Sequence, residues 1–190
     1  MILKKYKREA FYLPFFKKDT VPLKKDNTVF FTGHRNFYCP SGTLGAKKLE
    51  DLICSLYEKG FRNFIAGGAI GFDTMAAECV YRAKHKCPDM RLVLMLPCKN
   101  QDAKWGYDAK RLYKITLECA DKIIYISENY DKGCMFKRNR AMVDASSFGI
   151  SYCKKNEGGT AYTINYAREN GITIFNFANS ITTGDDRFPT

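Results

Sequence analysis

Residues 63–86 read NFIAGGAIGFDTMAAECVYRAKHK, and this stretch decides the fold of the chain. Residues 63–66 form a short apolar run, which predicts a buried strand. A glycine-rich turn follows at 67–73, and the spacing of residues 74–86 predicts a helix directly after it. A strand, a glycine-rich turn and a helix in succession indicate half of a β–α–β unit. Glycines in such a turn allow the N–H groups at the start of the helix to approach an anion.

The same alternation continues through the rest of the chain. Apolar runs predict further strands at 28–31, 91–96, 122–126, 148–152 and 172–175. Helical spacing predicts further helices at 44–60, 107–120, 138–145 and 158–168. Strands that alternate with helices indicate a parallel sheet, and continuous apolar strands are typical of sheets covered on both faces. The sequence therefore predicts an α/β, Rossmann-like fold: a mostly parallel sheet with helices on both faces.

Length and charge distribution predict one domain between two tails. A chain of 190 residues suits a single domain. We place this domain at 26–178, between a basic N-terminal extension at 1–25 and a polar C-terminal tail at 179–190. The extension holds eight basic and two acidic residues and so carries +6 of the net charge of +11. It is either a solvated arm or a docking segment for nucleic acid or another polyanion, and its aromatic residues predict that part of it packs on the domain.

Cysteine spacing and hydropathy predict the cellular compartment. The chain has eight cysteines, and no two lie closer than eight residues, so it has no C-x-x-C zinc or redox motif. We expect reduced thiols that pack as small apolar residues, no metal site and a cytoplasmic location. No apolar run approaches the ~18 residues of a membrane span, and the N-terminal residues lack the cleavage site of a signal peptide. We therefore expect no membrane partner.

Residues suited to anion binding gather at the predicted strand ends. In open α/β sheets the ligand binds at the carboxyl ends of the strands, where the direction of winding reverses. Glycine-rich or polar turns follow three of these ends, and a basic segment and two single side chains accompany them. The residues predicted to bind the ligand are Thr32, Gly33, His34, Arg35, Gly67, Gly68, Ala69, Gly71, Asp73, Gln101, Trp105, Arg138, Asn139, Arg140, Gly158, Gly159 and Thr160.

Most of these residues have both a structural and a functional interpretation. The glycines serve either tight packing of a helix on a strand or the close approach of a phosphate. Asp73 either caps its helix or hydrogen-bonds a ribose hydroxyl. Arg35 suits a bidentate phosphate contact, and His34 is a hydrogen-bond donor, a general acid or a structural residue. Trp105 either stacks on a base or packs against the domain.

Two arginines, at 138 and 140, stand at the predicted start of a helix. The helix dipole disfavours positive charge at that end, and a local conflict of this kind is typical of a functional site. We therefore predict that Arg138 and Arg140 line the same pocket as Arg35, together with the two glycine-rich turns at 67–73 and 158–160.

The set and order of these motifs resemble those of the Smf/DprA–LOG (SLOG) superfamily, and most closely its YpsA-like branch. The similarity spans about 28–176. It is carried by Thr32-Gly33-His34-Arg35, the turn at 67–73 with Ala76-Ala77-Glu78, Leu96-Pro97 with Gln101 and Trp105, Cys134-Met135, the segment 138–144 and Gly158-Gly159-Thr160. The resemblance implies a Rossmann-like fold and a pocket for a small anionic nucleotide or a nucleotide-derived ligand, such as ADP-ribose or NAD. No cofactor is certain.

Two groups of relatives imply different functions. Phosphoribohydrolases of the LOG type cleave a nucleotide N-glycosidic bond with a glutamate that follows a Gly-Gly-x-Gly-Thr turn. Here no acid follows Gly158-Gly159-Thr160 until Glu169. An N-glycosidase on this chain would therefore need another carboxylate beside the sugar, and the candidates are Asp73, Glu78 and Asp144.

DNA-processing relatives have a similar Arg-Asn-Arg segment and use this region with single-stranded DNA. Three hypotheses follow. The first is a binding or sensor domain for the nucleotide-type ligand, without turnover. The second is the N-glycosidase, and the third is single-stranded nucleic-acid binding with phosphate contacts from the basic extension. The sequence leaves open whether there is turnover and whether the chain forms a homo-oligomer.

Overall fold

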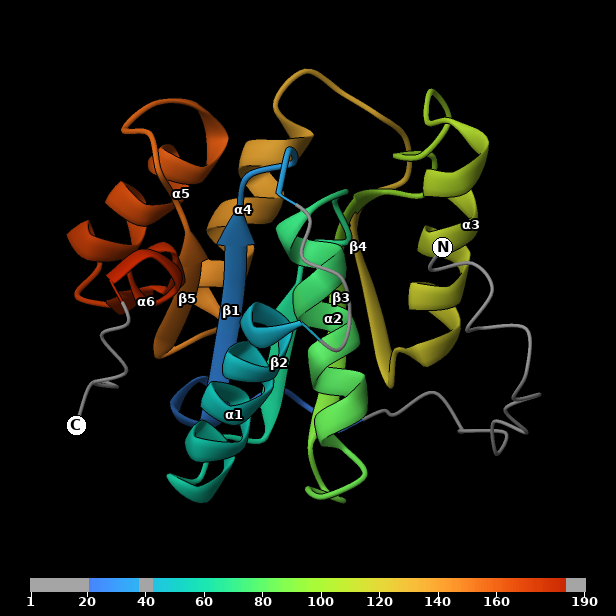
Figure 1. Ribbon diagram of the computed structural model, residues 1–190. Helices are drawn as coiled ribbons and strands as arrows, with labels where there is room; N and C mark the ends of the chain where they lie inside the picture. Colours follow the sequence, from blue (N-terminus) through green and yellow to red (C-terminus); the bar gives the residue numbers. More distant parts are fainter. Residues whose placement is uncertain (1–20, 38–42, 184–190) are drawn as a thin grey trace.

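The computed structural model describes residues 21–37 and 43–183, and these form one sheet with helices on both faces (Figure 1). The six strands lie in the order β4-β3-β2-β1-β5-β6, and every pairing is parallel. They are β1 (Thr28–Gly33), β2 (Asn63–Ala66), β3 (Arg91–Cys98), β4 (Lys122–Ser127), β5 (Phe148–Tyr152) and β6 (Thr173–Asn176). The predicted fold class is confirmed.

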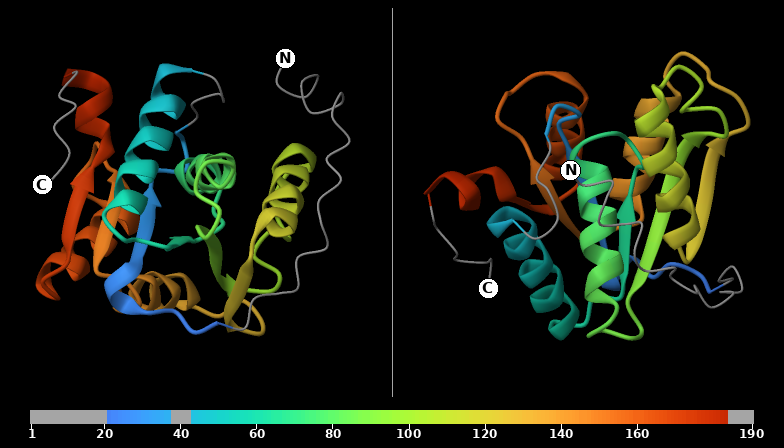
Figure 2. Two further views of the ribbon diagram at one scale, coloured as in Figure 1. Left: turned by 90° about the horizontal axis from the view of Figure 1, so that it is seen from below. Right: turned by 45° about the vertical axis from the view of Figure 1, so that its right-hand side comes forward.

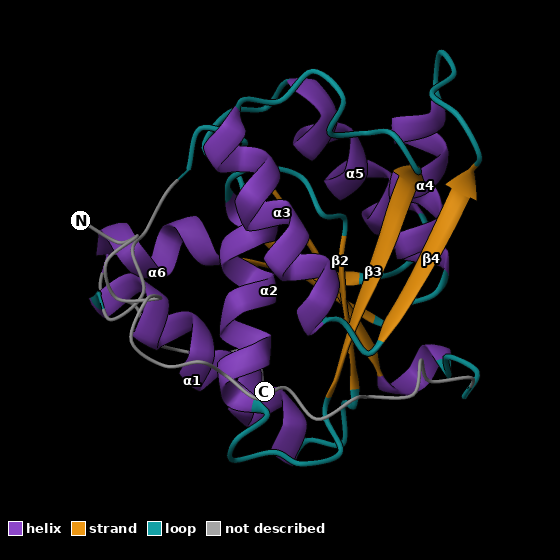
Figure 3. Ribbon diagram, turned by 90° about the vertical axis from the view of Figure 1, so that its right-hand side faces the viewer, coloured by secondary structure: helices purple, strands orange, loops and turns teal. Residues whose placement is uncertain are grey.

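Two layers of helices cover the sheet. The helices are α1 (Leu44–Glu58), α2 (Phe72–Ala83), α3 (Tyr107–Cys119), α4 (Cys134–Asp144), α5 (Gly158–Glu169) and α6 (Phe177–Thr183), and a short 3-10 helix, η2 (Lys25–Asn27), precedes β1. The view from below in Figure 2 and the side view in Figure 3 show α1, α2, α3 and α6 on one face and α4 and α5 on the other.

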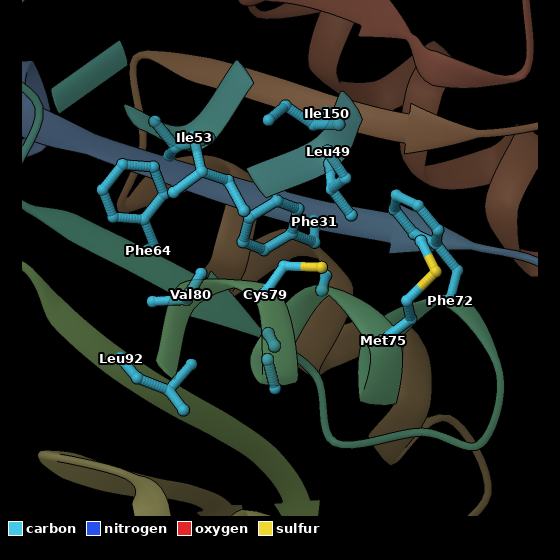
Figure 4. Close-up of a cluster of buried hydrophobic side chains, with 14 of the residues drawn as sticks. Phe31, Leu49, Ile53, Phe64, Phe72, Met75, Cys79, Val80, Leu92 and Ile150 are labelled. Carbon is cyan, nitrogen blue, oxygen red and sulfur yellow. The ribbon is translucent and has the colours of Figure 1, made fainter. Parts of the chain in front are cut away.

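Side chains of β1 alternate between two hydrophobic cores, because successive residues of a strand point to opposite faces. Val29 and Phe31 belong to the core beneath α1 and α2, whereas Phe30 packs in the core beneath α4 and α5. Figure 4 shows Phe31 in one buried cluster with Leu49 of α1 and Phe72 of α2. Burying a side chain of this size stabilises the fold by about 1.5–3 kcal/mol, so β1 fixes both layers of helices.

The first described residue, Val21, lies beside the amino-terminal ends of β3 and β4. The backbone oxygen of Val21 accepts hydrogen bonds from the side chains of Arg91 and Lys122, the first residues of β3 and β4, at 3.1 and 2.8 Å. The extension up to residue 20, with the aromatic side chains predicted to pack, lies outside the described residues. Within 21–37 and 43–183 no helix has the length and apolarity needed to cross a membrane.

Two predicted boundaries differ from the structure. The tail predicted from residue 179 begins inside α6, because Phe177 and Ala178 are buried and hold this polar helix on the domain. Helix α4 begins at Cys134 rather than 138, so Arg138 and Arg140 lie beyond its first turn. Its start follows Gly133, which has a left-handed backbone and offers no capping side chain, so the usual sequence signal is missing.

Gly71, in the turn between β2 and α2, meets two requirements that only glycine satisfies. Its φ is +93°, and a Cβ there would lie 2.4 Å from the carbonyl oxygen of Arg35. We expect Gly71→Ala to lower the free energy of unfolding by about 1–3 kcal/mol, measured by urea denaturation. Gly106→Ala is the matched control, because Gly106 has a φ of −67° and open space around it. Equal losses in the two variants would contradict this account of the turn.

Candidate functional site

The direction of winding reverses at β1. From β1 the chain adds β2, β3 and β4 on one side and then crosses to place β5 and β6 on the other. The carboxyl ends of β1 and β5, at the top of Figure 1, therefore border the crevice where sheets of this type bind ligands. A cavity of about 330 Å³ lies there. It is lined by Phe31, Thr32, Gly33, His34, Arg35, Ala69, Asp73, Met135, Arg138, Asn139, Met142, Glu157, Gly158, Gly159 and Thr160.

Segments far apart in the sequence meet at this cavity. The end of β1 and the turn after it contribute residues 32–35, the β2–α2 segment contributes Ala69 and Asp73, and the start of α5 contributes residues 158–160. Backbone hydrogen bonds at His34 hold these segments together. Its N–H donates to the carbonyl oxygen of Tyr152 at 3.2 Å, and its own carbonyl oxygen accepts from the N–H of Phe72 at 3.2 Å.

The first turn of α5 forms one wall of the cavity. The first N–H groups of a helix have no carbonyl partner within that helix. Glu157 at the N-cap makes no side-chain cap, and Gly158 and Gly159 have open space where a Cβ would stand. A helix start of this kind attracts an anion through its N–H groups and its dipole.

A buried ion pair closes the floor of the cavity. Nη1 of Arg138 lies 3.9 Å from Oδ2 of Asp73, and both side chains are buried. The same nitrogen donates to the carbonyl oxygen of Gly67, and Asp73 accepts from the N–H of Ala69 at 3.3 Å. Burial raises the pKa of the Asp73 carboxyl, while the charge of Arg138 and the N–H of Ala69 act in the opposite direction. Burial likewise lowers the pKa of Arg138, and the charge of Asp73 opposes this effect.

Hydrogen bonds connect this ion pair to the start of α5. Nε of Arg138 donates to the Asn139 side-chain oxygen at 2.8 Å, and Asn139 donates to Oγ1 of Thr163 at 2.8 Å. Thr163 in turn donates to the carbonyl oxygen of Gly159 at 2.7 Å. The wall formed by α5 is therefore joined to the floor through side chains of α4.

His34 lines the cavity but also ties one loop to another. Its Nε2 accepts a hydrogen bond from the backbone N–H of Lys154 at 2.9 Å. Acceptance at Nε2 places the proton of the neutral imidazole on Nδ1. In this arrangement Nε2 is not the donor considered from the sequence, and the side chain positions the loop that leads to α5.

Several residues predicted to bind the ligand lie outside the cavity lining. Buried Gln101 donates to the carbonyl oxygen of Gly68 at 3.2 Å, and Trp105 packs on Tyr113 with ring centroids 5.2 Å apart. Gly67, Gly68 and Gly71 belong to the turn between β2 and α2 but do not line the cavity. A Cβ at these positions would meet Arg138, Leu96 and the Arg35 backbone, respectively. Close packing therefore explains these three glycines.

Arg140 also lies outside the cavity lining, contrary to the prediction that it joins Arg35 and Arg138. Two residues along a helix correspond to about 200° around its axis, so Arg140 and Arg138 point in different directions. Nε of the exposed Arg140 donates to the hydroxyl of Tyr162 at 2.6 Å, and its guanidinium lies 5.5 Å from the ring centroid of Tyr166.

Only one of the three candidate catalytic carboxylates reaches the cavity. Asp73 lines it, but in contact with Arg138. Glu78 borders a separate gap of about 70 Å³ near α3, and Asp144 accepts from the Tyr166 hydroxyl at 3.0 Å. The structure adds another carboxylate, exposed Glu157, at the cavity rim. Its position directly before Gly158 is a signal present in the sequence, whereas the cavity contacts of Phe31, Met135 and Met142 depend on the fold.

Fold and cavity together define a Rossmann-like α/β domain with an anion-suited site at the strand ends. The family model of the YspA SLOG family matches residues 40–179, and the chain belongs to this family. Segment 32–35, which lines the cavity, precedes the matched range.

Relatives of this chain include proteins from bacilli. The SPbeta prophage-derived protein YoqJ of Bacillus subtilis is 34% identical over 133 residues, which cover 64% of this chain and 76% of YoqJ. A UPF0398 protein of Bacillus licheniformis is 26% identical over 126 residues, covering 65% of this chain and 69% of the relative.

Two solved structures share the fold. DNA processing protein A from Streptococcus pneumoniae superposes with a TM-score of 0.59 at 22% identity, covering 81% of this chain but only 50% of that protein. The Helicobacter pylori protein of the same name, described with a single-stranded DNA binding mode, gives a TM-score of 0.56 at 18% identity over 85% of this chain and 74% of the other.

The buried pair gives a stability prediction. Arg138→Met leaves Asp73 buried without its partner, and we expect the free energy of unfolding to fall by about 3–5 kcal/mol in urea denaturation. The double variant Arg138→Met/Asp73→Asn is expected to recover part of this loss, since no buried charge remains. Arg140→Met, on the exposed side of the same helix, is expected to cost no more than about 1 kcal/mol. A loss at Arg138 equal to that at Arg140 would show that the pair is not a structural element.

Proposed function

We propose that this chain binds a nucleotide or nucleotide-derived ligand of the ADP-ribose or NAD type, with a phosphate group at the start of α5. The observation that carries this proposal is the convergence of the glycine turn at 158–160 with Arg35 on one strand-end cavity. Membership of the YspA SLOG family and the position of the cavity at the reversal of winding support it.

Size and charge of the cavity favour a particular placement of the ligand. About 330 Å³ is at the low end for small-molecule sites, so the cavity suits a phosphate and a sugar with at most one base. Arg138 is compensated by Asp73, which leaves exposed Arg35 as the cation suited to a bidentate phosphate contact. The second half of a dinucleotide would then extend through the mouth of the cavity.

Arg35 provides the direct test of this proposal. In isothermal titration with AMP, ADP, ADP-ribose and NAD, we expect at least one of them to bind. Arg35→Ala is expected to weaken that ligand by about 1.5–3 kcal/mol, the range for hydrogen bonds to charged groups. The control Arg140→Ala is expected to keep the affinity of the unmodified protein. Absence of binding by all four compounds, or equal affinities in the two variants, would refute the proposal.

An N-glycosidase is the second candidate, and Glu157 is the observation that favours it. A carboxylate beside the sugar stabilises an oxocarbenium-like transition state, and Glu157 is exposed at the rim, next to the proposed phosphate position. Release of free base from the bound nucleotide, detected by chromatography and abolished in Glu157→Gln, would establish this activity. An intact ligand after incubation supports binding without turnover.

Binding of single-stranded nucleic acid is the third candidate function. It can be distinguished from nucleotide binding because the described end of the basic extension and the strand-end cavity lie at opposite ends of the strands. Val21 lies where β3 and β4 begin, whereas the cavity lies where β1 and β5 end. A chain that starts at Val21 lacks most of the basic extension but retains every described residue that lines the cavity. We expect this folded truncation to bind the nucleotide with unchanged affinity in the same titration.

The salt dependence of oligonucleotide affinity, measured for the full chain and for the truncation, tests the nucleic-acid candidate. If the extension contacts phosphates, truncation should reduce the log–log salt slope by about 0.7 for each contact that is lost. Loss of nucleotide binding in a folded truncation would show that the ligand site lies elsewhere.

A further inference from the structure

A second cavity, of about 340 Å³, lies beside α5. It is separate from the strand-end cavity, because the two have no lining residue in common. Helix α5 and strand β5, at the left of Figure 1, mark its place in the fold. Its lining residues are Ser151, Cys153, Asn156, Ala161, Ile164, Asn165, Arg168 and Asn176.

One wall of this cavity is fixed by the ends of β5 and β6. Ser151 and Asn176 are paired in the sheet register. The Asn176 side chain donates to the carbonyl oxygen of Cys153 at 2.8 Å and accepts from the N–H of Cys153 at 3.1 Å. These two hydrogen bonds hold Asn176 and the Cys153 backbone in one arrangement.

The opposite wall is one side of α5. Ala161, Ile164, Asn165 and Arg168 recur at the spacing of a single helix face. Ala161 and Ile164 are buried, whereas Asn165 and Arg168 are exposed. The cavity therefore has an apolar base and a polar rim, the arrangement typical of small-molecule sites.

The positive charge of Arg168 at the rim of the second cavity favours an anionic ligand. Arg168 is always cationic, and none of the described residues that line this cavity has a carboxylate. Within the described part of the chain, the Arg168 side chain makes no ion pair or hydrogen bond, and the side chains of Asn156 and Asn165 make no hydrogen bond. The donors at the rim are thus available to an anion.

We propose that this second cavity is a binding site for a small organic anion. A carboxylate or phosphate group contacts the guanidinium of Arg168, whose planar fork matches such groups. The side-chain amides of Asn156 and Asn165 supply further hydrogen bonds, and the apolar part of the ligand rests on Ala161 and Ile164. The site does not require the strand-end cavity to be occupied.

Cys153 provides a local readout, because its half-buried thiol lines the cavity. Alkylation by iodoacetamide is followed at each cysteine by peptide mass spectrometry. The probes are glycerol 3-phosphate and inorganic phosphate for the phosphate group, benzoate and succinate for the carboxylate group, and glycerol and benzyl alcohol as neutral compounds. We expect at least one organic anion to protect Cys153 saturably, by about tenfold at ten times its Kd, while the half-buried thiols of Cys54 and Cys119 react as before.

Variants separate this site from general salt effects and from the strand-end cavity. We expect Arg168→Gln to raise the Kd for the protecting anion at least about tenfold, as loss of a charged hydrogen bond implies. Arg140→Gln and Arg35→Ala are expected to leave it unchanged. The proposal fails if no anion protects Cys153 at millimolar concentrations, if protection survives Arg168→Gln, if neutral compounds protect equally, or if Cys54 and Cys119 are slowed to the same extent.

Discussion

The contact between Asp73 and Arg138 is the interaction on which the strand-end cavity depends. Arg138 belongs to α4 on one face of the sheet, and Asp73 belongs to α2 on the other, so the pair reaches across the carboxyl ends of the strands. Gly67 makes the contact possible, because a Cβ there would lie 1.7 Å from Nη1 of Arg138. Removing one partner leaves an uncompensated buried charge, which is costly in any protein interior.

The ion pair of Asp73 and Arg138 also determines which positively charged groups of the cavity lining remain uncompensated. Since Asp73 largely compensates Arg138, Arg35 and the first turn of α5 are the groups that we propose to attract the ligand. The hydrogen-bond chain through Asn139 and Thr163 holds that turn in place. The same loop that reaches α5 is fixed by His34 and borders the second cavity at Asn156, so both cavities are built on one connection between β5 and α5.

Local patterns in the sequence were sufficient for the fold. All six strands and five of the helices were predicted because apolar runs and helical spacing are local signals. Helix α6 was missed because its anchors, Phe177 and Ala178, precede a polar segment. The cavity lining includes Gly158, Gly159 and Thr160 of one glycine turn, but only Ala69 and Asp73 of the turn at 67–73. Arg140 lies outside the lining, because its direction depends on where α4 begins and Gly133 gives no capping signal. The partner of Arg138 and the contacts of His34 depend on tertiary packing and could not be derived from spacing. The binding roles of the lining residues stay predictions.

An NMR titration with ADP-ribose, observing backbone amides, tests the central claim most directly. Amide signals respond to a phosphate that accepts their hydrogen bonds, and each signal belongs to one residue. The account predicts that the amides of Gly158, Gly159 and Thr160 shift most, together with those at 33–35. No shift at saturating ligand, or shifts confined to residues remote from the carboxyl ends of β1 and β5, would contradict it.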